Sequence, residues 1–140
     1  MRYNPPMSDM DGLIERILAQ KTIAVVGLSP RPDRPSYQVA EYLKDAGYRI
    51  VPVNPAVEEV LGEKSYPDLK SVPESIDVVD VFRRPSDVIP VVEDAIEAGA
   101  AYVWMQEGIV NEEAAEKAKA AGIPVVMDLC IKKEHESRLE

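Results

Sequence analysis

Cysteine and histidine are almost absent from this sequence of 140 residues, which contains one residue of each kind. A single cysteine excludes a disulfide framework within the chain and is typical of a reducing compartment. One cysteine and one histidine are also too few for a usual zinc site. We therefore expect a cytoplasmic protein without a metal centre.

Positive charge and long apolar runs are scarce as well. The chain has 16 basic and 25 acidic side chains, and its net charge of −9 would repel a nucleic-acid backbone. No run approaches the roughly 18 apolar residues of a membrane span, and the segment 1–8 has no signal-peptide core. We expect one globular domain over 1–140, with an N-terminal extension at 1–8 and a polar tail at 132–140. Nucleic-acid and membrane partners are not expected.

Five short runs rich in valine, isoleucine and aromatic residues recur along the chain. Most of them do not alternate with polar residues, which is typical of strands covered on both faces. Segments of helical periodicity separate the runs, and strands that alternate with helices form a parallel sheet. The runs occupy 22–26, 49–53, 77–82, 101–105 and 124–127. The pattern predicts a doubly wound α/β fold with helices on both faces of the sheet.

Helix boundaries are indicated by capping residues and glycines. Ser36 and Asn111 are good N-cap residues, and the helices that follow them are expected to end near Gly47 and Gly122. Apolar residues at helical spacing predict further helices at about 9–20 and 86–97. A short helix is expected at 57–61, within the least regular part of the chain.

Four arginines follow two of the predicted strands. Arg31 and Arg34 lie in the loop that begins at Gly27, and Arg83 and Arg84 follow the third run. Ligands of open α/β sheets bind outside the carboxyl ends of the strands, and right-handed crossovers bring these loops to one edge. The arrangement predicts a ligand with several phosphates, because a charge-assisted contact contributes about 1.5–3 kcal/mol.

The alternative interpretation is that these arginines are solvated and pair with nearby carboxylates such as Asp33 and Asp87. The placement of four arginines in two converging loops favours the ligand. An ordinary dinucleotide site is less favoured, because Gly27-x-Ser29 replaces the glycine-rich fingerprint and Asn54 stands where a NAD site has an acidic residue. A P-loop motif is absent too.

Six short motifs follow one another along the chain. They are Gly27-x-Ser29, Ser36-x-x-Val39, Val53-Asn54-Pro55, Val81-Phe82-Arg83, Trp104-x-Gln106-x-Gly108 and Asp128-x-Cys130. In this order the motifs resemble the stand-alone CoA-binding domain proteins, which are related to the N-terminal domain of the succinyl-CoA synthetase α subunit. The resemblance covers about residues 10 to 135. It implies a Rossmann-like five-stranded parallel sheet that holds coenzyme A at its carboxyl edge.

The resemblance also implies the residues that contact coenzyme A. The first loop would contact the phosphates, and Asn54 and Pro55 would lie beneath the nucleotide. Residues 82–84 would flank the adenine and the 3′-phosphate, Val88 would line the pocket, and Gln106 and Gly108 would border the pantetheine. The expected binding residues are Gly27, Ser29, Pro30, Arg31, Arg34, Ser36, Asn54, Pro55, Phe82, Arg83, Arg84, Val88, Gln106 and Gly108.

The first loop departs from the synthetase pattern. The synthetase loop is glycine-rich and surrounds phosphate with backbone N–H groups, whereas Pro30, Pro32 and Pro35 donate no N–H. The resemblance is therefore to the stand-alone proteins. The phosphorylated histidine of the synthetase belongs to a second domain, so the resemblance implies a binding module without catalysis of its own.

Side chains that could carry chemistry are few. A helical tail would place Cys130 and His135 on different faces, so a Cys–His pair is not expected and His135 is expected to be solvated. Cys130 could form a mixed disulfide with the CoA thiol, although a small residue packed at a strand end is the more ordinary interpretation. Structural roles are favoured over acid–base roles for Glu107 and Asp128.

The sequence thus predicts a protein that binds coenzyme A or acyl-CoA and is not itself an enzyme. A NAD(P)- or flavin-dependent redox protein is the first alternative, and Asn54 argues against it. A detached subunit that supplies CoA to an acyl-CoA synthetase is the second. A protein partner or a homo-oligomer is compatible with either binding role.

Overall fold

Five parallel strands form the centre of the protein, of which the structure, a computed structural model, describes residues 6–139. The strands are β1 (Thr22–Val26), β2 (Arg49–Val53), β5 (Val78–Val81), β6 (Tyr102–Met105) and β7 (Val125–Met127). Their order is β2–β1–β5–β6–β7, and all neighbours are parallel. The chain therefore winds from β1 to both sides, which confirms the predicted doubly wound sheet.

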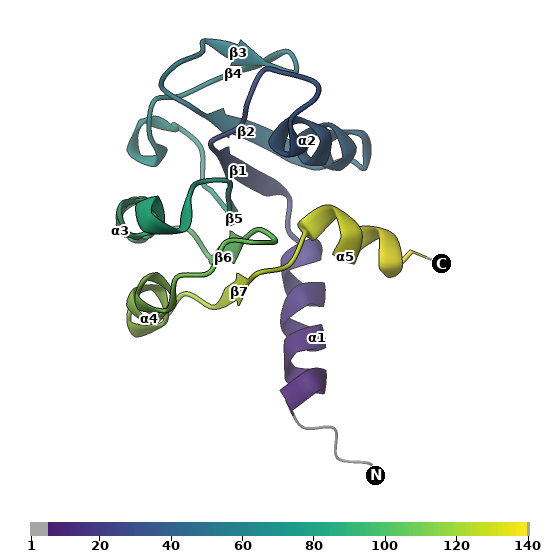
Figure 1. Ribbon diagram of the computed structural model, residues 1–140, viewed down its shortest axis with the longest axis vertical. Coiled ribbons are helices and arrows are strands. Elements are labelled where there is room, and N and C mark those ends of the chain that lie inside the picture. The colour runs from purple at the N-terminus through teal and green to yellow at the C-terminus, as the bar shows by residue number, and fades with distance from the viewer. Residues whose placement is uncertain (1–5, 140) are drawn as a thin grey trace.

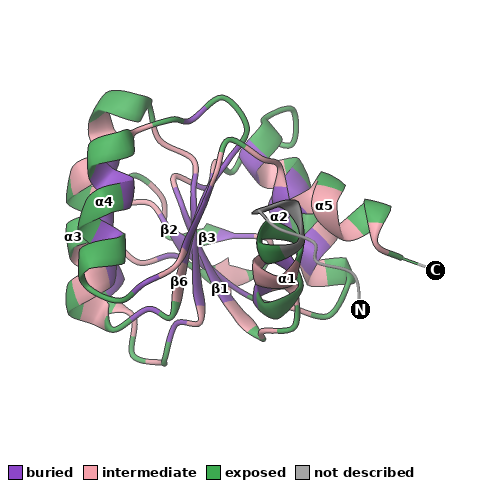
Figure 2. Cartoon of the chain, turned by 90° about the horizontal axis from the view of Figure 1, so that it is seen from below, coloured by how far each residue is buried: buried purple, intermediate pink, exposed green. Residues whose placement is uncertain are grey.

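Helices cover both faces of the sheet (Figure 1, Figure 2). One face carries α3 (Val88–Ala98) and α4 (Glu112–Ala120), and the other carries α1 (Pro6–Leu18), α2 (Pro35–Asp45) and α5 (Ile131–Ser137). Alternate residues of β1 enter the two cores: Ala24 and Val26 pack on the side of α3 and α4, and Ile23 and Val25 pack on the other side. All four are at most 5% exposed, so burial on both faces explains the uninterrupted apolar run.

The start of α2 differs from the prediction. Arg34 is the N-cap, and Pro35 takes the first helical position, so Ser36 does not cap the helix. Proline suits that position because its fixed φ is helical and its missing N–H has no partner there anyway. Asn111, by contrast, caps α4 as predicted, and its side chain accepts a hydrogen bond from the Ala114 N–H at 2.9 Å.

The predicted helix at 57–61 is wrong, because a small hairpin occupies this region. Its strands are β3 (Glu59–Val60) and β4 (Glu63–Lys64), which pair antiparallel. Leu61 and Gly62 form the turn with φ values of 56° and 76°, a combination that suits tight hairpins and ends a helix. Two short 3-10 helices complete the fold: η1 (Leu69–Ser71) and, directly before α3, η2 (Pro85–Asp87).

The segment expected to be a polar tail begins with the helix α5. Ile131, the first residue of α5, is fully buried, and Arg138 pairs with Asp11 of α1 at 3.0 Å. The Tyr42 hydroxyl of α2 and Nδ1 of His135 lie 2.7 Å apart in a hydrogen bond. His135 is therefore half-buried and bonded, which corrects its interpretation as a solvated residue.

The N-terminal extension predicted at 1–8 falls partly outside the described residues, since the description begins with α1 at Pro6. Within residues 6–139, none of the helices combines the length and the apolar character that crossing a bilayer requires.

Candidate functional site

The loop after β1 starts at Gly27, whose backbone φ is +89°. The Gly27 N–H donates to the Val53 carbonyl at 2.9 Å, and a Cβ at this position would lie 2.1 Å from the Phe82 carbonyl oxygen. Only glycine tolerates both the positive φ and this approach. Gly27 therefore lets the loops after β1 and β5 come into contact at the carboxyl edge.

The remainder of this loop is held by its own serines. Ser36 Oγ accepts a hydrogen bond from the Ser29 N–H at 3.0 Å, and Ser29 Oγ accepts one from the Arg31 N–H at 3.1 Å. The Ser36 hydroxyl, which does not cap α2, thus fixes the path of the loop before the helix. As a result, Arg31 and Arg34 are held on a defined backbone.

The loop after β5 supplies Phe82, Arg83, Arg84 and Pro85. The Phe82 N–H donates to the Val26 carbonyl at 2.8 Å, which extends the pairing of β5 with β1 by one residue. Asn111 Nδ2 donates to the Pro85 carbonyl at 2.8 Å and joins this loop to the start of α4. The loops after β1, β5 and β6, which are neighbouring strands in the sheet, therefore meet at one place.

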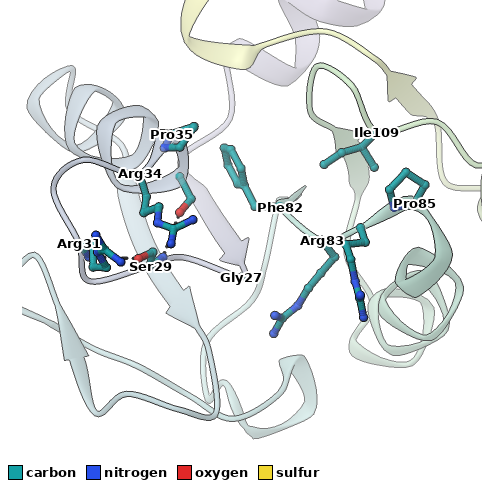
Figure 3. Close-up of a pocket in the computed structure, with 11 residues that line it drawn as sticks. Gly27, Ser29, Arg31, Arg34, Pro35, Phe82, Arg83, Pro85 and Ile109 are labelled. Atoms are coloured by element: carbon teal, nitrogen blue, oxygen red, sulfur yellow. Dashed lines mark hydrogen bonds between the residues drawn. The ribbon is translucent and has the colours of Figure 1, made fainter.

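A pocket of about 430 Å³ lies between these loops (Figure 3). It has an apolar part formed by Phe82, Ile109 and two prolines, and a cationic part formed by four arginines. The lining residues are Gly27, Ser29, Arg31, Arg34, Pro35, Ser36, Phe82, Arg83, Arg84, Pro85 and Ile109. Pockets of this size and mixed character are typical of small-molecule sites.

The four arginines have different electrostatic surroundings. Arg31 pairs with Asp33 at 3.2 Å, and Arg84 pairs with Asp87 at 3.1 Å. Within the described part of the chain, Arg34 makes no salt bridge of 4.0 Å or less, and neither does Arg83. The pocket therefore holds two neutralised and two uncompensated guanidinium groups.

Eight of the fourteen residues expected from the sequence line this pocket together. They are Gly27, Ser29, Arg31, Arg34, Ser36, Phe82, Arg83 and Arg84. Pro35, Pro85 and Ile109 also line the pocket and were not among the expected binding residues, although Pro35 belongs to the loop expected to contact the phosphates. Ile109 carried a usable signal, because it is an apolar residue in a loop at the carboxyl edge.

Asn54 and Pro55 line a second, more polar cavity beside the hairpin β3–β4. Asn54 Nδ2 donates to the Leu28 carbonyl at 2.9 Å, and Asn54 Oδ1 accepts from the Ala56 N–H at 2.9 Å. Both ends of the Asn54 amide are thus engaged with backbone. The side chain fixes the segment on which the pocket loop is built.

The other expected residues lie outside the pocket lining. Pro30 is exposed on the loop, and Val88 is fully buried in the core under α3. Gln106 is buried and its Oε1 accepts from the Ile131 N–H at 3.2 Å, which satisfies the start of α5. The Gly108 N–H donates to Asp128 Oδ1 at 2.7 Å, a structural role for that carboxylate.

The candidates for chemistry are engaged in structure as well. Glu107 pairs with Lys133 of α5 at 2.9 Å. Cys130 is half-buried and precedes α5, and its thiol forms no disulfide. The Cys130 side chain is not among those that line the 430 Å³ pocket.

A buried carboxyl group lies below the pocket in the middle of β5. Asp80 is completely buried between Val25 of β1 and Trp104 of β6, two residues before Phe82. Neither of its carboxyl oxygens has a hydrogen-bond partner among the described residues. Burial raises the pKa of Asp80 well above its ordinary value, because the charged form would lose its hydration.

A doubly wound parallel sheet with an amphipathic, cationic pocket over its carboxyl edge defines a Rossmann-like α/β domain. The family model described as CoA binding domain matches residues 21–136, and the chain belongs to that family. This membership confirms the resemblance inferred from the six sequence motifs.

The relatives include stand-alone proteins and parts of larger ones. The uncharacterized protein YneT of Bacillus subtilis (strain 168) is 46% identical over 132 residues, which cover 94% of this chain and 96% of YneT. The solved structure of a hypothetical protein from Pyrococcus horikoshii OT3 is 43% identical, with a TM-score of 0.91 and complete coverage of both chains. ADP-forming acetate–CoA ligase I of Archaeoglobus fulgidus is 26% identical over 129 residues, which cover 84% of this chain and 19% of the ligase.

Proposed function

We propose that this protein binds coenzyme A or an acyl-CoA in the pocket between the loops after β1 and β5. The observation that carries the proposal is the convergence of arginines from two loops with an apolar surface in one pocket of a CoA-binding-domain protein. Coenzyme A combines a diphosphate and a 3′-phosphate with an adenine and a long pantetheine arm, in which aliphatic carbons alternate with two amide groups. Each part of the pocket therefore has a counterpart in the ligand.

The two parts of the pocket would act on different parts of the ligand. Guanidinium groups form short, charge-assisted and often bidentate hydrogen bonds with phosphates. The Phe82 ring, Ile109 and Pro85 offer flat or aliphatic surface to the adenine or to the pantetheine arm. The lining supplies cations, hydroxyl groups and apolar surface, and we propose binding rather than catalysis as its role.

A nicotinamide dinucleotide fits the site less well. Discrimination of an unmodified ribose usually uses an acidic residue at the end of the second strand, which accepts hydrogen bonds from the hydroxyl groups. Asn54 stands there instead, and its amide already bonds to Leu28 and Ala56. Nothing in the pocket lining replaces the missing carboxylate.

A thermal-shift panel tests the proposal with CoA, dephospho-CoA, acetyl-CoA, NAD, NADP and ATP at equal concentrations. CoA or acetyl-CoA is expected to raise the melting temperature by several degrees, since a ligand at 100 times its Kd adds about 2.7 kcal/mol of stability. Dephospho-CoA is expected to give a smaller shift because it lacks the 3′-phosphate. If NAD, NADP or ATP alone shifted the melting temperature, the proposal would be wrong.

A further inference from the structure

More than half of the backbone N–H groups in the loop after β1 already have hydrogen-bond partners. The N–H groups of Gly27, Ser29, Arg31 and Arg34 donate to Val53 O, Ser36 Oγ, Ser29 Oγ and Arg31 O. The prolines at 30, 32 and 35 have no N–H at all. Among the described residues, the loop keeps only the N–H groups of Leu28, Asp33 and Ser36 without a hydrogen-bond partner. We therefore expect the arginine side chains to supply most of the attraction for an anion.

The arginine side chains are unequal in this respect. Asp33 stands 3.2 Å from Arg31 and Asp87 stands 3.1 Å from Arg84, and these two arginine side chains are 62% and 82% exposed. Each pair has no net charge, and its carboxylate repels a phosphate that approaches the guanidinium. Water also weakens contacts made at such exposed positions.

The other two arginines make no salt bridge among the described residues and keep their full charge, although Arg34 is exposed like Arg31 and Arg84. Arg83 is half-buried, and its Cδ lies 3.5 Å from the point where a Cβ on Gly27 would stand. The aliphatic part of Arg83 thus rests beside Gly27, which limits the freedom of the side chain. Arg34 is the N-cap of α2, so its backbone is fixed by the helix. Figure 3 shows Arg34 and Arg83 on either side of Gly27, with Arg31 further out along the loop.

We propose that Arg34 and Arg83 are the specificity-determining residues of this pocket, each binding one of two separate phosphate groups of the ligand, while Arg31 and Arg84 contribute little. The identity of the ligand as CoA rests on the proposed function. The unequal contributions of the four arginines to binding are inferred from their ion pairs and positions. This division selects ligands that carry two phosphate groups, one for each loop.

Four charge-matched variants test this division by isothermal titration calorimetry. Arg34→Gln and Arg83→Gln are expected to weaken CoA binding by about 10- to 100-fold each, the range of a lost charge-assisted contact. Arg31→Gln and Arg84→Gln change the net charge by the same amount and are expected to cost less than about threefold. Equal losses in all four variants would show that the general field of the protein binds the ligand, and would overturn the inference.

Arg34→Lys separates charge from hydrogen-bond geometry. Lysine keeps the positive charge but lacks the planar fork, so we expect an affinity between those of wild type and Arg34→Gln. Melting temperatures of the ligand-free variants serve as the control for folding. They are expected to match wild type closely, because these arginines are exposed or make no salt bridge in the structure.

Inorganic pyrophosphate, titrated in parallel, distinguishes this inference from the proposed function. Pyrophosphate carries the anionic charge without the nucleotide or the thiol. Pyrophosphate binding that depends on both Arg34 and Arg83, together with no CoA binding, would support the inference and refute the proposed function. CoA binding that is equally sensitive to all four arginines would support the proposed function and refute the inference. If wild type bound neither compound, both would be refuted.

Discussion

Replacing Gly27 by alanine should damage the protein more than the same change at other glycines with positive φ. The new Cβ would lie 2.1 Å from the Phe82 carbonyl oxygen, well inside any permitted contact. That oxygen belongs to the backbone between β5 and its loop, so it has no side-chain rotation by which to move away. The ends of β1 and β5 would have to separate.

The expected loss in the free energy of unfolding for Gly27→Ala has two parts. Placing a non-glycine residue at φ +89° costs about 1–2 kcal/mol. Forcing a packed backbone apart costs about a further 1–3 kcal/mol, the range of overpacked sites. The sum of about 2–5 kcal/mol is a large part of the roughly 5–15 kcal/mol that stabilises an ordinary domain.

Gly122→Ala is the matched control. Gly122 has a φ of +84°, and a Cβ there would meet no atom within 4 Å, so only the cost of the conformation applies. Urea unfolding, followed by the fluorescence of the single, fully buried Trp104, measures both variants. With a urea slope of about 2 kcal/mol per molar, the midpoint should fall by about 1–2.5 M for Gly27→Ala and by about 0.5–1 M for Gly122→Ala. Equal midpoints would refute the argument from close approach.

Three further substitutions test other parts of the structure. Asp80→Asn should flatten the pH dependence of the free energy of unfolding. Because burial raises the pKa of Asp80, the folded state holds a proton that the unfolded state releases above about pH 4. The free energy of unfolding of wild type therefore falls by up to about 1.4 kcal/mol per pH unit above that pH. Parallel stability curves for the two proteins between pH 5 and 8 would contradict this. Asn54→Ala should lower the free energy of unfolding in urea by about 1–3 kcal/mol by removing two backbone hydrogen bonds, and it should weaken CoA binding because Leu28 is no longer held; unchanged stability would exclude that role. Tyr42→Phe should cost about 0.5–1.5 kcal/mol in the same assay through the lost bond to His135, and a midpoint equal to wild type would show that this bond does not stabilise the docking of α5.

The strands could be predicted from sequence because burial on both faces leaves a direct compositional trace. β1 and β2 match their predicted ranges, and the other three strands are one or two residues shorter than the apolar runs. The runs are longer because residues such as Phe82 continue the hydrogen-bonded pattern for one step beyond the strand. The parallel, doubly wound arrangement followed from the alternation of strands and helices, which favours a parallel sheet.

The hairpin β3–β4 could not be predicted because its turn lacks the usual residues. Tight hairpins of this kind favour asparagine or aspartate before glycine, and here Leu61 takes the first left-handed position. Leucine is a good helix former, so the local sequence pointed to a helix. At the start of α2 the signal was present: Pro35 is typical of a first helical position, and it outweighed Ser36.

At the pocket, sequence could predict which loops meet but not which side chains face the ligand. The end of β6 shows why: Gln106 continues the alternation of the strand and points to the face covered by α5, where it is buried and bonded to Ile131. Ile109, three residues later and past the turn at Gly108, reaches the pocket instead. A difference of a few residues in a loop thus decides between core and lining, and only the coordinates of the turn determine it.

The sequence also could not decide which of the four arginines form ion pairs. Two interpretations were open from the sequence, a phosphate ligand for all four or ion pairs with nearby carboxylates. The ion pairs form for Arg31 and Arg84, because each has an aspartate two or three residues along the chain. For Arg34, which is followed at once by a helix, and Arg83, which follows a buried strand, no salt bridge forms within residues 6–139. The fold therefore leaves a charge uncompensated on each of the two loops that border the pocket, where a ligand with two phosphate groups would gain most from it.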